Sequence, residues 1–470
     1  IGCTVTSENA KKVVQFLEAL ESENMNLLEV QDSTTRFGWQ GKGRFLPGFG
    51  DGIVLDLVGD PKKWAAAYCK NGSLNGWVEQ ILPLWRQDNK TTNWYKFRFV
   101  LSAAFFPPAL SILKQRSFIV YNWGDSKGGK TAAMKWAASV WGIPEKLLVS
   151  FNATAFALEK LAGFFCDLPL FIDERQLAGA NQDFLERMVY MLSNGVGRAR
   201  GNKEGNVNVI GAWNTVALMT GEEPIAATNS KTGVNTRMVE VQGAPFKDEA
   251  AAAAAHLRAT DNCGWAGIEF LDWVMKNEDD FKIRHAKMCD EVKALGLTTN
   301  GAHLAAISAV STVSAIVSEI ILQYPRELSE SGAKEMAESM LTDLKNNELP
   351  DVNVSAAQFI VDFIATHPRA FAEKPDGNDW YGWVDDNLAY MFTNPIKEAL
   401  EKAGFSYRKT IKYLLDNKII NDYNGESTTV KRMGNKTYRV MIVNMKKIMP
   451  EGQLSFLTTV DDDTNLPMGW

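Results

Sequence analysis

The chain has 470 residues, of which 46% are hydrophobic and 23% charged, and its formal net charge is -6. This composition is typical of a soluble globular protein that is long enough for two or three domains. The small acidic excess excludes a globally basic nucleic-acid-binding protein, so any contact with DNA has to come from local basic patches.

Cysteine and histidine usage argues against disulfides and against a metal site built on these residues. The five cysteines are scattered without a Cys-x-x-Cys pair, and the four histidines stand apart from one another. This pattern favours a reducing, cytoplasmic compartment. No basic segment followed by an apolar core marks a secretory signal at the N-terminus. Because the sequence begins at Ile1 and not at a methionine, the question whether an N-terminal domain precedes it stays open.

The longest apolar stretch runs from Leu304 to Leu322 and is interrupted by serine, threonine and glutamate. We therefore expect a buried helix there and no membrane association.

In chain order, residues 4–29 predict a helix with an apolar stripe. From about Thr34 to Leu57, short extended pieces are separated by glycine, which indicates a small β subdomain or edge meander. Three further helices are expected before the next landmark, the last interrupted by a proline pair: residues 64–68, 77–86 and 95–113.

The strongest motif is Gly124-Asp125-Ser126-Lys127-Gly128-Gly129-Lys130-Thr131, which fits the P-loop pattern G-x-x-x-x-G-K-[ST]. Residues 117–121 predict a buried strand before it, and residues 132–140 predict a helix after it. In that context, backbone N–H groups and a helix N-terminus surround a phosphate. Lys130 would reach the β and γ phosphates of ATP, and the Thr131 hydroxyl would bind Mg²⁺. The alternative is a glycine-rich turn before an ordinary helix.

A second acidic motif follows. Residues 147–151 predict a strand, and residues 153–161 predict a helix capped by Asn152. The next apolar strand ends in Asp173-Glu174, which is a Walker B pattern. Asp173 would hold Mg²⁺ through water, and Glu174 would polarise the attacking water. Many strands end in an acidic residue, but a P-loop upstream favours the ATPase interpretation.

A basic loop comes next. Residues 184–192 predict a helix, and residues 193–206 then combine glycine and asparagine with basic side chains. This pattern indicates a β-hairpin whose tip carries Arg198, Arg200 and Lys203. A solvated surface loop is the alternative, since basic glycine-rich turns are common.

Two more strands complete the predicted core. Residues 213–219 lead to Thr220, where a sensor for the γ-phosphate of ATP would lie, and Arg237 stands immediately before an apolar strand. For Arg237, the alternative is a surface salt-bridge arginine at a strand edge. The alternation of strands and helices predicts an α/β fold with a mostly parallel sheet.

Helices dominate the rest of the chain. A helical lid region is expected from residues 250–257, 265–276, 281–295, 302–322 and 333–345. After a linker at 350–353, three helices at 355–364, 394–402 and 406–417 precede a hairpin that turns at Gly434-Asn435. Helices followed by a basic hairpin are the order of a winged helix.

The winged helix has candidate side chains for duplex DNA: Arg408, Lys409, Lys412, Lys431, Arg432 and Lys436. Winged helices also serve as protein-docking modules, so both interpretations stay open.

Several of these motifs occur together in one known family. They are the P-loop continuing into Ala137-Ala138-Ser139-Val140-Trp141-Gly142, the Asp173-Glu174 strand, the segment from Val189 to Arg200, Thr220-Gly221-Glu222 and the Arg237 strand. From about Thr35 to Val274 the chain resembles the uncharacterised-domain family of P-loop ATPases of phages, plasmids and other mobile elements, which are often fused to or encoded beside primases. The resemblance implies an AAA+ ATPase similar to the ring-forming MCM-type replicative helicases.

The resemblance also implies roles. Lys130, Thr131, Asp173 and Glu174 would form the hydrolysis site. Thr220 would be the first sensor, and Arg237 an arginine finger acting on the ATP of the neighbouring subunit. The basic hairpin would face the central channel of a ring and grip the phosphate backbone of one strand. In one departure from the family, the sensor arginine expected near residues 300–305 is missing. Only His303 is found there, so that role stays unassigned.

The expected organisation is α/β: an N-terminal helix and small β subdomain at 1–60, an AAA+ P-loop core at 61–300, a helical lid at 301–350, a winged-helix-like domain at 351–450 and an acidic tail at 451–470. The leading interpretation is an ATP- and Mg²⁺-dependent DNA helicase, a hexameric ring on single-stranded or forked DNA, with a primase or initiator as partner. One alternative is an ATP-dependent DNA-binding initiator or switch without processive unwinding. A nucleotide kinase is disfavoured because the Walker B glutamate suits attack by water.

Overall fold

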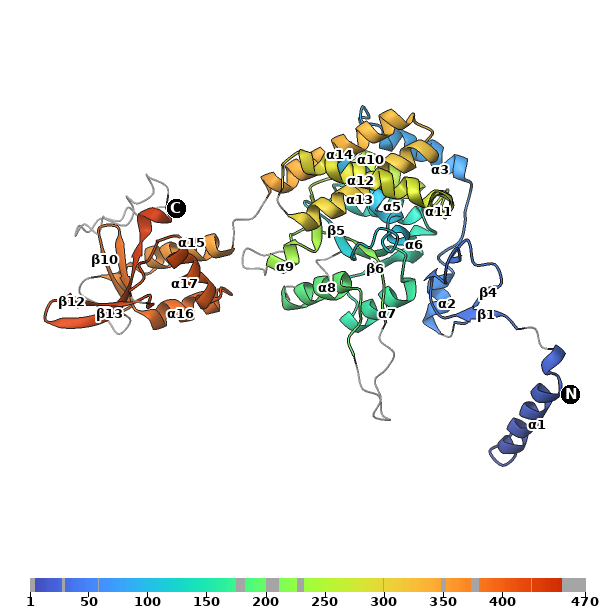
Figure 1. The fold of residues 1–470 in the computed structure, drawn as a ribbon, viewed down its shortest axis with the longest axis horizontal. Coiled ribbons are helices and arrows are strands. Elements are labelled where there is room, and N and C mark those ends of the chain that lie inside the picture. The colour runs from blue at the N-terminus through green and yellow to red at the C-terminus, as the bar shows by residue number, and fades with distance from the viewer. Residues whose placement is uncertain are drawn as a thin grey trace.

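The computed structural model describes residues 5–27, 30–57, 59–174, 182–199, 211–225, 232–298, 300–347, 352–372, 380–423 and 425–449 (Figure 1). Within these ranges, the buried apolar side chains form a large core between Phe37 and Leu341 and a smaller one between Ala356 and Met445.

The N-terminal part is a helix followed by short strands. Its elements are α1 (Ala10–Glu23), η1 (Met25–Leu27), β1 (Asp32–Thr34), β2 (Gly38–Trp39), β3 (Phe45–Leu46) and β4 (Ile53–Leu55). Helix α1 buries no residue and is shorter than predicted. The predicted short extended pieces are confirmed, but β1 pairs with β4 in parallel whereas β2 and β3 are antiparallel, so of the two alternatives the meander is wrong. Phe37 and Phe45 belong to the large core, which fixes this segment on the rest of the molecule.

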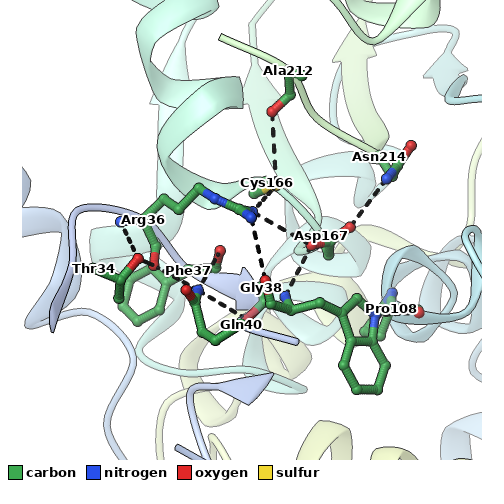
Figure 2. Close-up of polar contacts among 11 residues, drawn as sticks. Thr34, Arg36, Phe37, Gly38, Gln40, Pro108, Cys166, Asp167, Ala212 and Asn214 are labelled. Atoms are coloured by element: carbon green, nitrogen blue, oxygen red, sulfur yellow. Dashed lines mark hydrogen bonds and ion pairs between the residues drawn. The ribbon is translucent and has the colours of Figure 1, made fainter. Parts of the chain in front are cut away.

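The Asp167 carboxylate holds the β2 segment in place (Figure 2). The Trp39 backbone N–H donates to Asp167 Oδ2 at 3.0 Å, and Asn214 Nδ2 donates to Oδ1 at 3.3 Å. Arg36 Nη1 lies 3.9 Å from the same carboxylate and 2.6 Å from Cys166 Sγ. Burial raises the pKa of the Cys166 thiol to about 12, so this cysteine is a neutral packing group near pH 7.

Helices α2 (Asp60–Ala65), α3 (Leu74–Trp85) and α4 (Trp94–Phe105) follow, and then η2 (Pro107–Ala109). Helix α4 ends before the proline pair because proline has no N–H to donate to the preceding turn. The predicted helix over 95–113 is therefore shorter than expected, although its burial is confirmed.

The central sheet has the order β6 (Leu148–Ser150), β7 (Leu170–Asp173), β8 (Val216–Gly221), β5 (Phe118–Trp123) and β9 (Met238–Gln242). All neighbouring strands are parallel, which confirms the predicted parallel sheet. The inner strands are buried along their length, as expected for a sheet covered on both faces. Since parallel strands end at the same edge, the segments after β5, β7 and β8 meet there.

The helices interleaved with this sheet are α5 (Lys130–Ser139), α6 (Pro144–Leu147), α7 (Ala155–Phe165), α8 (Gln182–Asn194) and α9 (Thr232–Asn235). The predicted cap of α7 is wrong: the Thr154 hydroxyl, not Asn152, accepts a hydrogen bond from the Ala157 N–H at 3.2 Å. Asn152 lies too far upstream to reach the first turn.

A helical layer follows, made of α10 (Glu249–Arg258), α11 (Ala266–Lys276), α12 (Glu278–Ala294), α13 (Gly301–Ile320) and α14 (Arg326–Asn346). Helices α12, α13 and α14 gather on one side of the molecule in Figure 1, and α13 also packs on α4. Among the described residues, α13 is the one helix long and apolar enough to cross a membrane, but most of it is buried among its neighbours. The predicted buried helix is thus confirmed.

The C-terminal part contains α15 (Val352–Thr366), η4 (Pro368–Phe371), α16 (Thr393–Lys402), α17 (Tyr407–Asp416) and η5 (Met445–Lys447). Its sheet has the order β10 (Gly382–Asp385), β11 (Leu388–Met391), β13 (Lys436–Asn444) and β12 (Thr429–Met433). The predicted turn at Gly434-Asn435 is confirmed, because Met433 pairs with Lys436. The hairpin of β10 and β11, which extends that sheet, was not predicted.

Candidate nucleotide and nucleic-acid sites

The P-loop adopts backbone conformations that require glycine at Gly129. Its φ is +78°, and a Cβ there would stand 2.5 Å from the Phe246 ring and 2.8 Å from Ala252. Helix α5 begins at the next residue, so its N-terminal N–H groups open onto the loop. This geometry creates an anion-binding position between β5 and α5.

Lys130 lies across its own loop. Its ammonium donates to the Gly124 carbonyl at 2.8 Å and the Asp125 carbonyl at 2.6 Å. Burial lowers the pKa of Lys130, while nearby carboxylates, first of them Glu222, oppose that effect. Because a charged phosphate is a stronger hydrogen-bond acceptor for an ammonium than a neutral carbonyl, it would compete with these two carbonyls effectively.

Several of the predicted site residues converge on Asp173. Its Oδ1 accepts hydrogen bonds from the hydroxyls of Thr131, at 3.3 Å, and Thr220, and from the Glu174 N–H at 3.1 Å. The Glu174 N–H also lies 3.3 Å from the Thr220 hydroxyl. The structure therefore brings the P-loop threonine, both acidic residues and the predicted sensor together.

These residues line a cavity of about 460 Å³, a size that suits a nucleotide. The P-loop and the ends of β7 and β8 form one side, and α10 forms the other. Lys127 and Glu249, an ion pair at 3.3 Å, connect the P-loop to α10. Helix α10 is thus a wall of the candidate nucleotide site.

Two further cavity residues were not assigned a role from sequence. Glu222 hydrogen-bonds to the Ser126 hydroxyl, and His256 on α10 lies 2.8 Å from the ammonium of Lys135. Burial, followed by the charge of Lys135, lowers the pKa of His256. Glu222 follows Thr220 closely enough for its position to be inferred, but nothing in the sequence around His256 indicates the cavity.

The site fits a magnesium ion that is shared with phosphate. Thr131 and Asp173 offer a hydroxyl and a carboxylate oxygen, which are hard donors of the kind that Mg²⁺ prefers. Within the described ranges, no group of three His, Cys, Asp or Glu side chains could hold a metal ion. Phosphate and water oxygens would therefore have to complete the coordination.

Arg237 lies at the opposite edge of the sheet, at the amino end of β9. Its Nη1 donates to the Gly233 carbonyl at 2.8 Å, and its guanidinium carbon stands 4.6 Å from the centre of the Tyr190 ring. It does not line the P-loop cavity. Any action of Arg237 on ATP would consequently involve the ATP of another copy of the chain.

His303 supports the segment that carries Arg237. Its Nε2 lies 2.7 Å from the Asn235 carbonyl and 3.0 Å from the Met238 carbonyl. His303 is therefore a contact between α13 and the start of β9, and it does not line the P-loop cavity. The sequence showed this histidine but not its partners.

The structure describes the base of the predicted basic hairpin. Val196 and Ala212 form an antiparallel bridge, and the Gly197 N–H donates to the Gly211 carbonyl at 2.8 Å. Arg198 is exposed, and its backbone N–H donates to Glu159 Oε1 at 3.2 Å. The other two predicted tip residues, Arg200 and Lys203, lie outside the described residues.

The predicted basic side chains of the C-terminal part are all exposed. Arg408, Lys409 and Lys412 share the outer face of α17, while Ile411 and Leu414 face the small core. The others lie on the hairpin of β12 and β13: Lys431, Arg432 and Lys436. The arrangement provides a basic helix and a basic hairpin, both open to solvent.

Comparisons with known proteins agree with this architecture. Residues 1–210 match the family described as "Domain of unknown function (DUF927)", and residues 351–447 match the "Cch helix turn helix domain". A solved structure described as "SCCmec type IV Cch - active helicase" has a similar fold, with a TM-score of 0.67 and 17% sequence identity over 94% of this chain and 85% of that chain. No curated protein matches the sequence.

At this identity the likeness establishes the fold and leaves activity to be argued from the site. The chain thus has a helicase-like α/β fold, and its C-terminal helices and hairpin agree with the predicted winged helix.

Proposed function

We propose that this protein is an ATP-driven DNA helicase of the AAA+ type, similar to MCM-like motors, that acts in the replication of a phage or mobile genetic element. The observation that carries the proposal is the convergence of Lys130, Thr131, Asp173, Glu174 and Thr220 on one cavity. The similar fold of a chain described as an active helicase supports it.

Each cavity residue has a chemical role in hydrolysis. The P-loop N–H groups and the N-terminus of α5 would bind the phosphates, and Lys130 would neutralise the β and γ phosphates. Thr131 and Asp173 would hold Mg²⁺, which supplies charge neutralisation at the phosphates. Glu174 would orient the attacking water and accept its proton. The Thr220 hydroxyl holds the Asp173-Glu174 turn in place for this task.

A ring follows from the position of Arg237. Because Arg237 lies at the sheet edge opposite the P-loop, it can complete an ATP site only in a head-to-tail assembly, and such an interface forms a ring when its rotation closes. We propose a hexamer. The five-stranded order, with the P-loop strand between β8 and β9, supports an AAA+ core at 61–300, a lid at 301–350 and a winged-helix domain at 351–450.

DNA contacts belong to two basic regions. The hairpin with Arg198, Arg200 and Lys203 would grip the backbone of one strand in the ring channel. The basic face of α17 and the β12–β13 hairpin would bind duplex DNA, and the match to a helix-turn-helix domain supports this. A primase or initiator as partner and a cytoplasmic location stay predictions.

Mixing subunits tests the motor. Arg237→Ala protein added to wild-type protein should lower the DNA-stimulated ATPase rate more steeply than dilution predicts, because each variant subunit impairs its neighbour's site. Strand displacement on a forked substrate is measured in the same mixtures. A linear decline of the ATPase rate would contradict the ring. ATP hydrolysis without strand displacement would favour the alternative, an ATP-dependent initiator or switch.

A further inference from the structure

A second cavity, of about 670 Å³, lies at the sheet edge that carries Arg237. Lys114, Arg116, Arg237 and His303 line it, and none of the described residues that line it is acidic. Three cations without a carboxylate among them leave a positive potential in a concave site, which attracts a polyanion.

The side chains of both neighbours of Arg116 contact other parts of the molecule. On one side of it, Gln115 Nε2 lies 3.1 Å from His285 Nε2; on the other, the buried Ser117 hydroxyl accepts from the Thr215 N–H at 2.9 Å. The Arg116 side chain itself is exposed and makes no hydrogen bond or ion pair within the part of the chain that the structure describes. The residues on both sides of Arg116 are therefore held in place, while its guanidinium group can bind a ligand.

The strand pairing brings Arg116 close to Arg237. The Ile119 N–H donates to the Arg237 carbonyl at 3.0 Å, and Arg116 lies two residues before β5 begins at Phe118, so both arginines line the same cavity. Arg237 is partly engaged by the Gly233 carbonyl and the Tyr190 ring, whereas Arg116 keeps all its donors for a ligand.

We propose that Arg116 is a second cation that acts on the triphosphate bound by the P-loop of a neighbouring copy, beside Arg237. This inference rests on the proposed function, since it needs a head-to-tail assembly. Two guanidinium groups would bind the equatorial oxygens of the transferred phosphoryl group, where negative charge is spread in the transition state. Lys114, exposed at the same cavity, would add long-range attraction for the triphosphate.

The test pairs two inactive variants. Arg116→Ala leaves its own P-loop intact, and Glu174→Gln leaves its own arginines intact but removes the residue that activates water. Each alone should lose at least about tenfold in DNA-stimulated ATPase rate, while binding of a fluorescent ATP analogue stays within about twofold of wild type. In an equal mixture, the rate should recover to roughly a quarter of the wild-type value, because one interface in four joins an intact site to intact arginines.

Controls separate the outcomes. Arg86→Ala removes an exposed arginine whose ion-pair partner, Asp88, is also exposed, and this variant should hydrolyse ATP like the wild type. Arg116→Lys should restore part of the lost rate. Thermal melting of Arg116→Ala should match the wild type, because the side chain makes no hydrogen bond or ion pair with the described part of the chain.

Several results would overturn the inference. One is a wild-type ATPase rate for Arg116→Ala. Another is an equal mixture of Arg116→Ala and Glu174→Gln that recovers no ATPase rate, although an equal mixture of Arg237→Ala and Glu174→Gln does. In both, the proposed function survives. Loss of single-stranded DNA binding with an unchanged DNA-free ATPase rate would assign the cavity to a polynucleotide instead. If wild-type protein hydrolyses no ATP, the proposed function and this inference fail together.

Discussion

At the scale of single residues, Glu174 is exposed to solvent and has an unusual backbone conformation. Its φ is +65°, and its N–H is held by the Asp173 carboxylate and lies near the Thr220 hydroxyl. A non-glycine residue in this region is uncommon, and such conformations persist where the surroundings enforce them, often at functional sites. The turn after β7 thus presents the carboxylate of Glu174 to the cavity, as a water-activating residue requires.

Gly38 also has a positive φ, but its role is structural. Its φ is +84°, and a Cβ would stand 2.3 Å from Asp167 Oδ2. Gly38→Ala should therefore displace the carboxylate that holds the β2 segment. The free energy of unfolding should fall by more than left-handed backbone strain alone would cost, which is about 1 to 2 kcal/mol. Chemical denaturation measures the change.

Gly41 provides the matched control. Its φ is also positive, at +112°, but a Cβ there would meet nothing within 4 Å. Gly41→Ala should show the strain alone. Equal losses for the two variants would mean that the Asp167 contact contributes nothing to stability.

At the scale of helices and strands, the packing of α12 against α13 encloses His285. Its ring lies 3.1 Å from Gln115 Nε2, 3.3 Å from the Thr312 hydroxyl and 3.4 Å from Cys289 Sγ. Burial lowers the pKa of His285 below its usual 6.5, and it also raises the pKa of the Cys289 thiol. The neutral imidazole is therefore the form that the helix pair accepts.

This predicts a loss of stability in mild acid. Between the lowered pKa of His285 in the folded state and its usual 6.5, the unfolded chain binds this proton more than the folded chain does. The free energy of unfolding therefore falls as the pH falls, by at most about 1.4 kcal/mol per pH unit. Denaturation of wild type and His285→Gln between pH 7.5 and about 5 measures the effect. The stability difference between the two should shrink as pH falls. A constant difference would show that His285 titrates alike in both states.

At the scale of the whole molecule, the fold separates ATP chemistry from basic surfaces. The P-loop cavity and the cavity of Arg116 and Arg237 lie at opposite edges of one sheet, which suits an assembly in which each subunit completes the site of the next. The basic face of α17 belongs to the smaller core, with its own sheet.

The winged helix leads to a prediction about salt. Replacing Arg408, Lys409 and Lys412 by alanine should weaken duplex DNA binding. The slope of log affinity against log salt should become shallower by about 0.9 for each phosphate that is no longer neutralised. Fluorescence anisotropy with duplex DNA between 50 and 200 mM salt, about the range over which such ion pairs dominate, measures the slope.

The matched control removes the same charge elsewhere. Lys276, Lys282 and Lys287 are exposed lysines on α11 and α12 that pair with carboxylates. Their triple alanine variant should keep the wild-type slope. If the α17 variant also keeps it, the C-terminal helices dock a protein and not DNA.

Much of the candidate site could be predicted from sequence because its chemistry is carried by short, contiguous patterns. The P-loop, the Asp173-Glu174 strand end and the Gly434-Asn435 turn depend on neighbouring residues, and hydrophobic periodicity indicated the strands between them. The hairpin of β10 and β11 was missed because its pairing partner, β13, lies far along the chain.

The sequence by itself determined which residues could bind a triphosphate and that a parallel sheet would carry them, since local steric preferences and burial patterns are encoded in adjacent residues. Only the tertiary structure decided that the Thr220 hydroxyl would contact the turn after β7 and that His303 would support the start of β9. It also decided that Arg116 and Arg237 would line the same cavity. These contacts depend on strand order, and strand order is set by the packing of segments that are distant in the chain.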